Sequence, residues 1–383
     1  MVIKRMKILH LIDTSLPQWR TEKCAISAKK NGHSVYFGGP INSKHQSIFD
    51  KTYEIKWTPA ARHKFPHQWN AVKKQMKRII AEVRPDVIHA HNIFSAKMAM
   101  EIGDYPLVYN DHEFWSIYVK RQLEAYNISK SANNDKSFYL RRILRNFARD
   151  FLKKRWVRIW SNAERDLVTR FPTITVSQSI VEAHNKISKR NFLVPNFPLY
   201  EEIEFIDKPT YHESLSSVYA GVEAKGLIRP THRNLEGFFE TFEKHNLGKL
   251  YVLGWNGPST NNIIYRGYLN REEMYKEMAN HSIGLVPFKK HWSHKYISPN
   301  KAYEYAHAGL LVMNTSALRP ISETMEGYGL SYENNEGLKD VLRYLSHNVE
   351  ELYAKRLKLY KHARNMLLWE RYEKNIFEAY KMC

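Results

Sequence analysis

The sequence has little cysteine and no long hydrophobic run. Only two of its 383 residues are cysteines, Cys24 and Cys383, and they lie near opposite ends of the chain. This argues against a disulfide framework or a metal site, so we expect a reducing, cytoplasmic compartment. No stretch approaches the roughly 20 apolar residues that a membrane-spanning helix needs. The apolar run within residues 1–12 lacks a small-residue cleavage site, so we interpret it as a buried strand rather than a signal peptide.

Acidic residues are also scarce relative to basic ones. The chain has 59 lysines and arginines against 39 aspartates and glutamates, which gives a net charge of +20. An excess of this size favours a polyanionic partner, either nucleic acid or an anionic membrane. No zinc-ligand spacing, RNA-binding sheet motif or recognition helix accompanies the charge. We therefore expect an anionic membrane surface and no nucleic acid, with an evenly solvated basic surface as the alternative.

What the sequence does contain is an alternation of short apolar runs with amphipathic segments. This order is typical of a parallel sheet that helices cover on both faces. The pattern lapses into proline, acidic and turn residues between 196 and 215, where we place a linker. Residues 70–83 are predicted to form a basic amphipathic helix. The first-half strands are predicted at residues 8–12, 33–37, 86–90, 106–109, 173–177 and 192–195.

These patterns predict an α/β chain of two Rossmann-like, parallel-sheet domains. Such domains are expected to face each other across a cleft at the carboxyl ends of their strands, where open parallel sheets bind ligands. The N-terminal domain is placed at residues 1–200 and the C-terminal domain at 201–365. Residues 366–383 are predicted to form a helix that packs back on the N-terminal domain.

The segment 298–309 is the first candidate for a ligand site. Ser298 is predicted to be a helix N-cap, with Pro299 at the first helical position. The free amides that follow, Asn300 onward, and the cation of Lys301 would suit a diphosphate. Glu304 comes one turn later, where a carboxylate can accept hydrogen bonds from ribose hydroxyls. A capped surface helix explains this segment equally well.

A second candidate follows the predicted strand 217–221. Two glycines, Gly221 and Gly226, bracket Lys225. A loop of this kind lets the backbone approach a phosphate while the lysine neutralises its charge, although glycine after a strand is ordinarily only a turn. Arg229 and Arg233 follow closely and offer the same charge.

The order of these segments resembles the retaining glycosyltransferases of family four, which have the GT-B fold. The resemblance covers nearly the whole chain. In the second half it consists of the Gly…Lys-Gly loop, the Tyr-x-Gly turn that begins at Tyr265, the Gly-Leu-Val-Pro-Phe strand at 284–288 and the Ser-Pro-Asn-Lys-x-x-Glu-Tyr segment. In the first half it consists of residues 84–92, the Val-Tyr-x-x-His-Glu segment at 108–113, the Ile-Thr-Val-Ser run at 174–177 and Val-Pro-Asn at 194–196.

Three departures from the family's pattern stand out. Glu304 matches the second of two glutamates that many members carry, but Tyr296 stands at the first. Val222 occupies the place of an arginine, so Arg229 or Arg233 is expected to substitute for it. The glycine-rich first loop is replaced by residues 16–20, in which Arg20 is expected to face the donor phosphates.

The resemblance implies a glycosyltransferase of class EC 2.4 that moves a sugar from a UDP-, GDP- or similar nucleotide-sugar, with retention and without a metal. Positive charge on Lys225, Arg233 and Lys301 would stabilise the leaving diphosphate. His112 matches a first-domain histidine that positions the donor sugar or the acceptor hydroxyl, with Asp111 or Glu113 assisting.

His89 and His91 are expected to face opposite sides of a strand and to bind no zinc. His91 is grouped with Arg20 and Asp111 on the acceptor and phosphate side. The donor-binding residues are predicted to be Gly221, Lys225, Arg229, Arg233, Tyr265, Ser298, Pro299, Asn300, Lys301 and Glu304.

Residues 138–160 carry eight cations against a single acid, Asp150. An aromatic and aliphatic helix face accompanies them, and such a helix can lie in a membrane interface. The alternative is a helix whose apolar face is core and whose cations are solvated. We expect a peripheral protein on the inner face of the membrane, acting in polysaccharide biosynthesis on a glycan or polyprenyl-linked acceptor. The predicted membrane contacts are Arg141, Arg145, Arg149, Lys153 and Trp156.

Two other functions remain open on the sequence. A nucleotide-sugar 2-epimerase would share the fold and need no acceptor. A catalytically degenerate glycosyltransferase acting as a subunit would fit the replacements at Tyr296 and Val222. The base, the sugar, the linkage and the oligomeric state are not encoded in a pattern that we can interpret.

Overall fold

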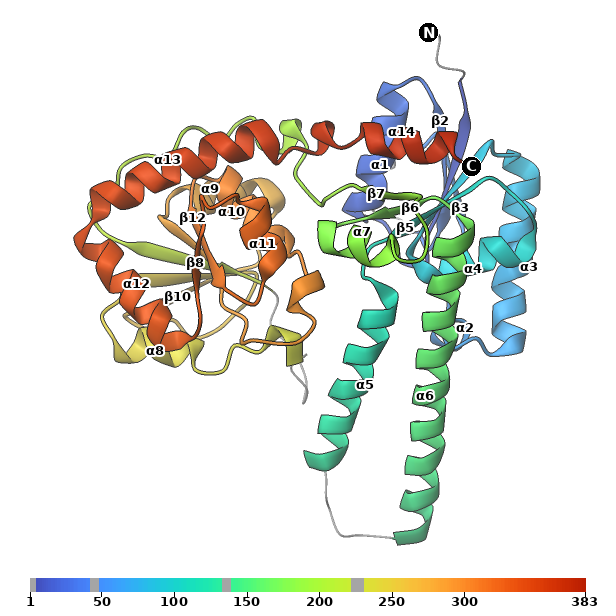
Figure 1. Cartoon of the computed structure of the whole chain (residues 1–383), viewed down its shortest axis with the longest axis horizontal. Helices are drawn as coiled ribbons and strands as arrows, with labels where there is room; N and C mark the ends of the chain where they lie inside the picture. Colours follow the sequence, from blue (N-terminus) through green and yellow to red (C-terminus); the bar gives the residue numbers. More distant parts are fainter. Residues whose placement is uncertain (1–4, 42–47, 133–138, 222–230) are drawn as a thin grey trace. The chain divides into compact units, whose positions relative to one another are not determined.

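The computed structural model describes residues 5–41, 48–132, 139–221 and 231–383, with side chains throughout these ranges except at 128–132, 139–149 and 231. The chain forms two compact units (Figure 1). Unit 1 consists of Met1–Leu123, Asn133–Pro195 and Tyr372–Cys383, and unit 2 of Glu124–Ala132 and Asn196–Arg371. The main division therefore falls between Pro195 and Asn196, and the last segment of the chain belongs to unit 1.

Unit 1 contains a seven-stranded sheet in the order β3-β2-β1-β4-β5-β6-β7, and every described pairing in it is parallel. The central strands are buried because helices cover both faces of the sheet. The strands are β1 (Lys7–Leu11), β2 (Ser34–Gly39), β3 (Lys51–Glu54), β4 (Val87–His91), β5 (Leu107–Asp111), β6 (Thr173–Thr175) and β7 (Asn191–Leu193). The helices are α1 (Trp19–Lys30), α2 (Pro59–Arg62), α3 (Pro66–Val83), α4 (Asn92–Ile102), α5 (Trp115–Ala132), α6 (Tyr139–Arg170), α7 (Gln178–His184) and α14 (Lys374–Lys381).

The two faces of this sheet differ in chemistry because successive side chains along a strand point to opposite sides. On one face, Leu9 and Ile88 join side chains of α3, α4 and α6 in the hydrophobic core. On the other face, His10 and His89 lie against polar groups, and His89 bonds to Tyr380 of α14. The helix α3 shows the expected pattern, with buried residues spaced by three or four, and it begins at Pro66, earlier than predicted.

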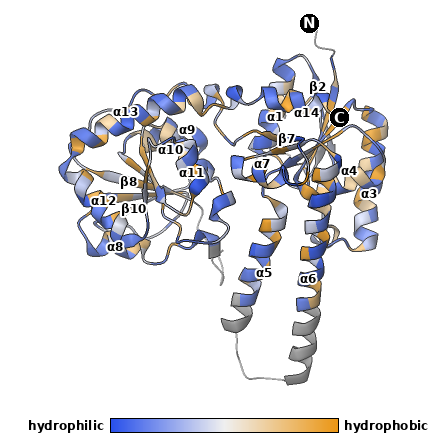
Figure 2. Ribbon diagram, in the orientation of Figure 1, coloured by the Kyte–Doolittle hydropathy of each residue, from blue (hydrophilic) through white to orange (hydrophobic). Residues whose placement is uncertain are grey.

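The long helix α6 contributes only part of its length to this core. Trp160 and Leu167 are fully buried against α4 and its neighbours. Towards the start of the helix, by contrast, Phe151 is 62% exposed. Hydrophobic and hydrophilic residues alternate along the described part of α6 (Figure 2). In the part of the chain that the structure describes, we find no helix with both the length and the apolar character that crossing a bilayer requires.

Unit 2 contains a six-stranded parallel sheet in the order β10-β9-β8-β11-β12-β13. The strand β8 lies in the middle of this sheet, between β9 and β11. The residues that follow β8 therefore lie near the middle of the sheet's carboxyl edge. The strands are β8 (Ser216–Ala220), β9 (Lys249–Leu253), β10 (Ile263–Gly267), β11 (Ile283–Val286), β12 (Leu311–Thr315) and β13 (Leu330–Tyr332). The helices are α8 (Phe238–Lys244), α9 (Arg271–Ala279), α10 (Asn300–His307), α11 (Arg319–Thr324), α12 (Asn335–His347) and α13 (Val349–Met366).

Candidate active site

The carboxyl ends of β8 and β9 approach each other very closely. Gly254, which follows β9, has φ +80°, and a Cβ there would lie 2.8 Å from the carbonyl oxygen of Gly221. A Cβ on Gly221 would lie 2.8 Å from the Tyr219 Oη and 3.0 Å from the Lys301 Nζ. The contact at Gly254 is with backbone and the φ is positive, so this position requires glycine, whereas the contacts at Gly221 are with side-chain ends that can shift. The bare backbone at Gly221 leaves room for the amine of Lys301 at the end of β8.

Lys301 is held there by aromatic rings rather than by an anion. Its Nζ lies 4.2 Å from the centroid of the Tyr219 ring and 5.3 Å from that of Phe288. Burial, with a smaller contribution from the Arg233 cation, lowers the pKa of the Lys301 amine to about 7, while Glu304 acts in the opposite direction. A desolvated amine of this kind gains a proton when a phosphate binds beside it. The site is therefore electrostatically suited to an anion.

The helix α10 begins differently from the prediction. Its N-cap is Pro299, in an extended conformation, and no side chain caps the helix. Ser298, predicted to be the cap, instead shares a hydrogen bond with the Tyr303 hydroxyl. Because the backbone of Pro299 is extended, the first helical residue is Asn300, which is exposed. The first amides of α10 therefore have no side-chain acceptor, which favours the binding of an external anion.

Glu304 lies one turn into α10 and is already part of an ion-pair network. Its Oε1 is 3.2 Å from a guanidinium nitrogen of Arg271, at the start of α9. Arg271 also pairs with Glu202, which precedes β8 in the chain. The Glu304 side chain is only 13% exposed. Arg271 therefore fixes the orientation of the Glu304 carboxylate, a role that no local sequence pattern indicated.

The remaining residues predicted for unit 2 are placed as follows. Arg233 is exposed in the short 3-10 turn Thr231–Arg233 and acts on Lys301 through its charge. Tyr265 is half-buried on β10, with its ring 6.1 Å from that of Trp255. Tyr296 is half-buried in the turn His294–Tyr296 just before α10. Lys225 and Arg229 lie outside the described residues.

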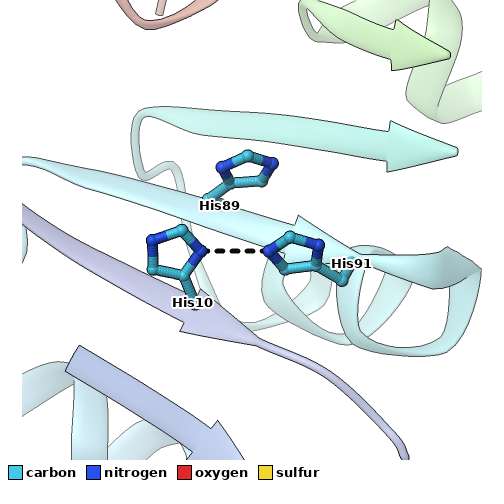
Figure 3. Close-up of side chains that lie close together, drawn as sticks. All are labelled: His10, His89 and His91. Carbon is cyan, nitrogen blue, oxygen red and sulfur yellow. Dashed lines mark hydrogen bonds between the residues drawn. The ribbon is translucent and has the colours of Figure 1, made fainter. Parts of the chain in front are cut away.

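In unit 1, a cluster of histidines occupies the polar face of the sheet (Figure 3). His10 Nδ1 lies 3.0 Å from His91 Nε2, and the rings of His89 and His91 stack with their centroids 4.3 Å apart. The expectation that His89 and His91 face opposite sides is therefore wrong. Residues two apart on a strand share a face, because the side-chain period of a strand is two.

The hydrogen bonds around His89 fix its protonation. Arg20 Nε donates to Asn110 Oδ1 at 2.9 Å, so the amide nitrogen of Asn110 points at His89 Nε2, 2.9 Å away. His89 consequently accepts at Nε2 and donates from Nδ1 to the Tyr380 hydroxyl at 2.8 Å. Arg20 also donates to the Val194 carbonyl at 2.8 Å. Arg20 is buried, and within unit 1 its hydrogen bonds connect the ends of strands. The sequence had suggested that it faces the donor phosphates.

His112 continues this cluster towards the surface. It is half-buried, and its Nε2 lies 3.2 Å from His91 Nδ1. Burial, with a smaller contribution from the Arg20 cation, lowers the pKa of His112 well below its usual value. The imidazole is therefore neutral at physiological pH, and it can donate or accept a hydrogen bond without carrying charge.

The two acids beside His112 have different environments. Asp111 is fully buried, where it accepts hydrogen bonds from the Tyr109 hydroxyl and from His184, each at 3.0 Å. Glu113 is exposed, and one of its oxygens lies 3.6 Å from the Arg121 guanidinium. Of the two, only Glu113 is accessible to a ligand from solvent.

Two groups of described residues have ligand atoms close enough to hold a metal ion, all within 4.8 Å of one another. The sequence indicated neither of them. The first is the histidine cluster. Its nitrogens already bond to Asn110, Tyr380 and His112, and the cation of Arg20 acts on it, so it is poorly suited to a dication. The second is formed by Asp111, Glu164 and His184.

The residues predicted for membrane contact lie on α6. The side chains of Arg141, Arg145 and Arg149 are outside the described residues. Trp156 is half-buried and packs against the core of unit 1, with its ring 6.1 Å from that of His63. The Lys153 amine lies 5.6 Å from the Trp156 ring centroid. Trp156 is thus partly a core residue, and among the described side chains of this stretch the exposed apolar ones are Phe151 and Leu152.

Two parallel sheets of this topology define the GT-B fold, and the solved structures that the chain matches share it. Sucrose-phosphate synthase from Thermosynechococcus elongatus is 12% identical, with 98% of each chain covered and a TM-score of 0.73. Alr3699/HepE from Anabaena, in complex with UDP-glucose, is 12% identical over 99% of this chain and 100% of that one, with a TM-score of 0.63. WaaG, a glycosyltransferase involved in lipopolysaccharide biosynthesis, is 13% identical over 98% and 99%, with a TM-score of 0.60.

At these identities the structural likeness establishes the fold, and the class comes from a sequence match. Residues 24–188 match the family model described as Glycosyltransferase Family 4. No curated protein matches the chain significantly. The family match together with the GT-B fold identifies the chain as a glycosyltransferase, which confirms the class and the fold expected from the sequence.

Proposed function

We propose that this enzyme binds a nucleotide-sugar on unit 2 and transfers the sugar, with retention, to a glycan or polyprenyl-linked acceptor at the cytoplasmic face of a membrane. The observation that carries the proposal is the convergence of Gly221, Lys301 and Glu304 at the carboxyl edge of the second sheet. This is the edge at which open parallel sheets bind ligands. The UDP-glucose complex of the HepE structure supports a nucleotide-sugar donor.

Each group at this edge suits one part of the donor. The Lys301 amine and the uncapped amides of α10 would neutralise the diphosphate. The Glu304 carboxylate, oriented by Arg271, would accept hydrogen bonds from the ribose hydroxyls. Lys225, Arg229 and Arg233 would add positive charge that stabilises the departing diphosphate, so the transfer step itself would need no metal.

On unit 1, we assign His112 to positioning a hydroxyl of the donor sugar or of the acceptor. Its neutral imidazole is held by His91, which itself bonds to His10. A ring fixed in this way presents its second nitrogen in one orientation, and a preoriented group contributes to catalysis without reorganising. The exposed Glu113 carboxylate would assist it.

The membrane part of the proposal rests on exposed cations and apolar side chains of unit 1, which we together call the cationic surface. It consists of exposed cations on two helices, α3 and α6, that pack on the same face of the sheet together with the exposed apolar side chains of α6. Apolar side chains among cations are typical of a segment that lies in a membrane interface. The residues are Lys74, Lys77, Arg78, Phe151, Leu152, Lys154, Arg155 and Arg158.

A Glu304→Gln variant tests the donor site. Glutamine keeps the size of the side chain but loses the charge, and a hydrogen bond to a charged group contributes about 1.5–3 kcal/mol. We expect UDP-glucose, or whichever UDP-, GDP- or ADP-sugar raises Tm most, to bind roughly ten- to a hundredfold more weakly by calorimetry. The matched control is Glu323→Gln, an exposed acid of α11 that pairs with Arg319. Equal affinity for wild type and Glu304→Gln would refute the assignment.

The pKa of Lys301 predicts how donor binding depends on pH. The free amine is protonated below about pH 7 and neutral above it, whereas the phosphates of UDP-glucose do not titrate near this pH. Affinity should therefore fall as pH rises, by up to about tenfold per pH unit above pH 7. Titrations from about pH 6 to about pH 8.5 measure this slope.

Lys301→Arg is the matching variant, because arginine stays charged over this range. The affinity of this variant for the donor at any one pH can differ from that of wild type, but the decrease in affinity with rising pH should disappear. A wild-type affinity that does not vary with pH, or a slope that persists in Lys301→Arg, would show that Lys301 does not contact the phosphates.

Charge reversal tests the cationic surface. Each cation near anionic lipid contributes about 1 kcal/mol, so Lys154→Glu/Arg155→Glu/Arg158→Glu should bind phosphatidylglycerol vesicles at least about a hundredfold more weakly than wild type. Vesicle sedimentation at low salt measures this. The control carries the same charge change on exposed residues of unit 2, Arg343→Glu/Lys358→Glu/Lys361→Glu. Equal losses in both triple variants would indicate net charge rather than a specific surface.

A further inference from the structure

A second cluster of titratable side chains lies inside unit 1 and includes Asp111, which the sequence placed on the acceptor side but which is fully buried. Asp111 ends β5, Glu164 lies in α6 and His184 ends α7. All three are buried, with at most 3% of any of them exposed. One ligand atom from each lies within 4.8 Å of the other two. Three elements far apart in the sequence therefore bring two carboxyls and an imidazole to one enclosed point.

The hydrogen bonds of this cluster leave one oxygen unsatisfied. Asp111 accepts from the Tyr109 hydroxyl and from His184 Nε2, each at 3.0 Å. Glu164 Oε2 accepts from the backbone amide of Ser116 at 2.9 Å. Glu164 Oε1 is enclosed and has no hydrogen-bond partner. An unpaired buried carboxyl oxygen is costly, and buried charges are ordinarily paired or bound to a metal.

A proton on Glu164 would neutralise one of the two carboxyl charges and leave that of Asp111. A cation placed between the two carboxyls satisfies Oε1 and neutralises both charges at once.

We propose that Asp111, Glu164 and His184 bind a divalent transition-metal ion, with Zn²⁺ or Mn²⁺ as the matching chemistry. Asp111 Oδ2, Glu164 Oε1 and His184 Nε2 are the ligand atoms. Two carboxylates balance the charge of the ion, and one imidazole with two carboxylates suits these metals better than Mg²⁺ or Ca²⁺. The histidine cluster, by contrast, has no anion and lies beside Arg20.

The geometry is close to that of a metal centre. Metal bonds to imidazole nitrogen and carboxylate oxygen are about 2.0–2.2 Å long, so two ligands at right angles are about 3 Å apart. Asp111 Oδ2 and His184 Nε2 are 3.0 Å apart and share a hydrogen bond, so binding of an ion would displace the proton from His184 Nε2. The hydroxyl of Tyr109, bonded to the other oxygen of Asp111, would orient that ligand.

The ion would act on structure rather than on the transferred sugar. It would join the end of β5 to α6 and α7, immediately before His112 in the chain. Because all three side chains are enclosed, the ion would enter while the protein folds, and its binding would add to folding stability. This inference does not depend on the identity of the donor or of the acceptor.

Metal content tests the proposal directly. The full-length protein is unfolded in the presence of a chelator, refolded with Zn²⁺, with Mn²⁺ or with the chelator alone, and desalted. Mass spectrometry should then find about one equivalent of one of the two metals. The metal-refolded protein should have a higher Tm than the chelator-refolded protein. A protein that refolds without retaining either metal, or whose Tm does not depend on metal, overturns the proposal.

The variant Glu164→Gln identifies the site. Glutamine keeps the size of the side chain, and its amide oxygen can still accept a hydrogen bond from the Ser116 amide. If Glu164 only forms hydrogen bonds, the substitution should change Tm little. We expect Glu164→Gln to lose the bound metal and the metal-dependent rise in Tm. Glu182→Gln, an exposed acid of α7, should retain both. Metal retained at wild-type level in Glu164→Gln would place the ion elsewhere, for example at the histidine cluster, and would refute the assignment.

Discussion

The donor half of this enzyme depends on one steric constraint, the contact between the backbones that follow β8 and β9. Gly254 lies so close to the carbonyl of Gly221 that it has no room for a Cβ. The space left by Gly221 is occupied by the amine of Lys301, which reaches in from α10. The low pKa of that amine follows from this burial. One close contact thus creates both the shape of the site and its affinity for an anion.

The fold was largely predictable because most of the parallel strands contain a buried apolar run that is visible in the sequence. The edge strands β3 and β13 have little buried apolar surface and were not predicted. The start of α10 was predicted incorrectly. Ser298 has the composition of an N-cap, but its hydroxyl bonds to Tyr303 instead. The partner is a side chain in the helix that Ser298 was expected to cap, so composition alone did not indicate which local hydrogen bond would form.

The sites were less predictable because their partners come from distant segments. Applied correctly, the two-residue period of a strand would have placed His89 and His91 on one face and so indicated the histidine cluster. By contrast, no spacing links Arg271 to Glu304, or Glu164 to Asp111. Glu164 is one acid within a mostly basic helix, and only the packing of α6 against the end of β5 gives it a role.

The assignment as a glycosyltransferase rests on the family match and the fold, whereas the transfer reaction rests on the chemistry of the strand ends. The most direct measurement follows label from a radioactive nucleotide-sugar incubated with the protein and membrane lipid extract. We predict label in the lipid fraction, with the anomeric configuration of the donor. An epimerised sugar formed without any acceptor, or a donor that binds and is never consumed, would contradict this account.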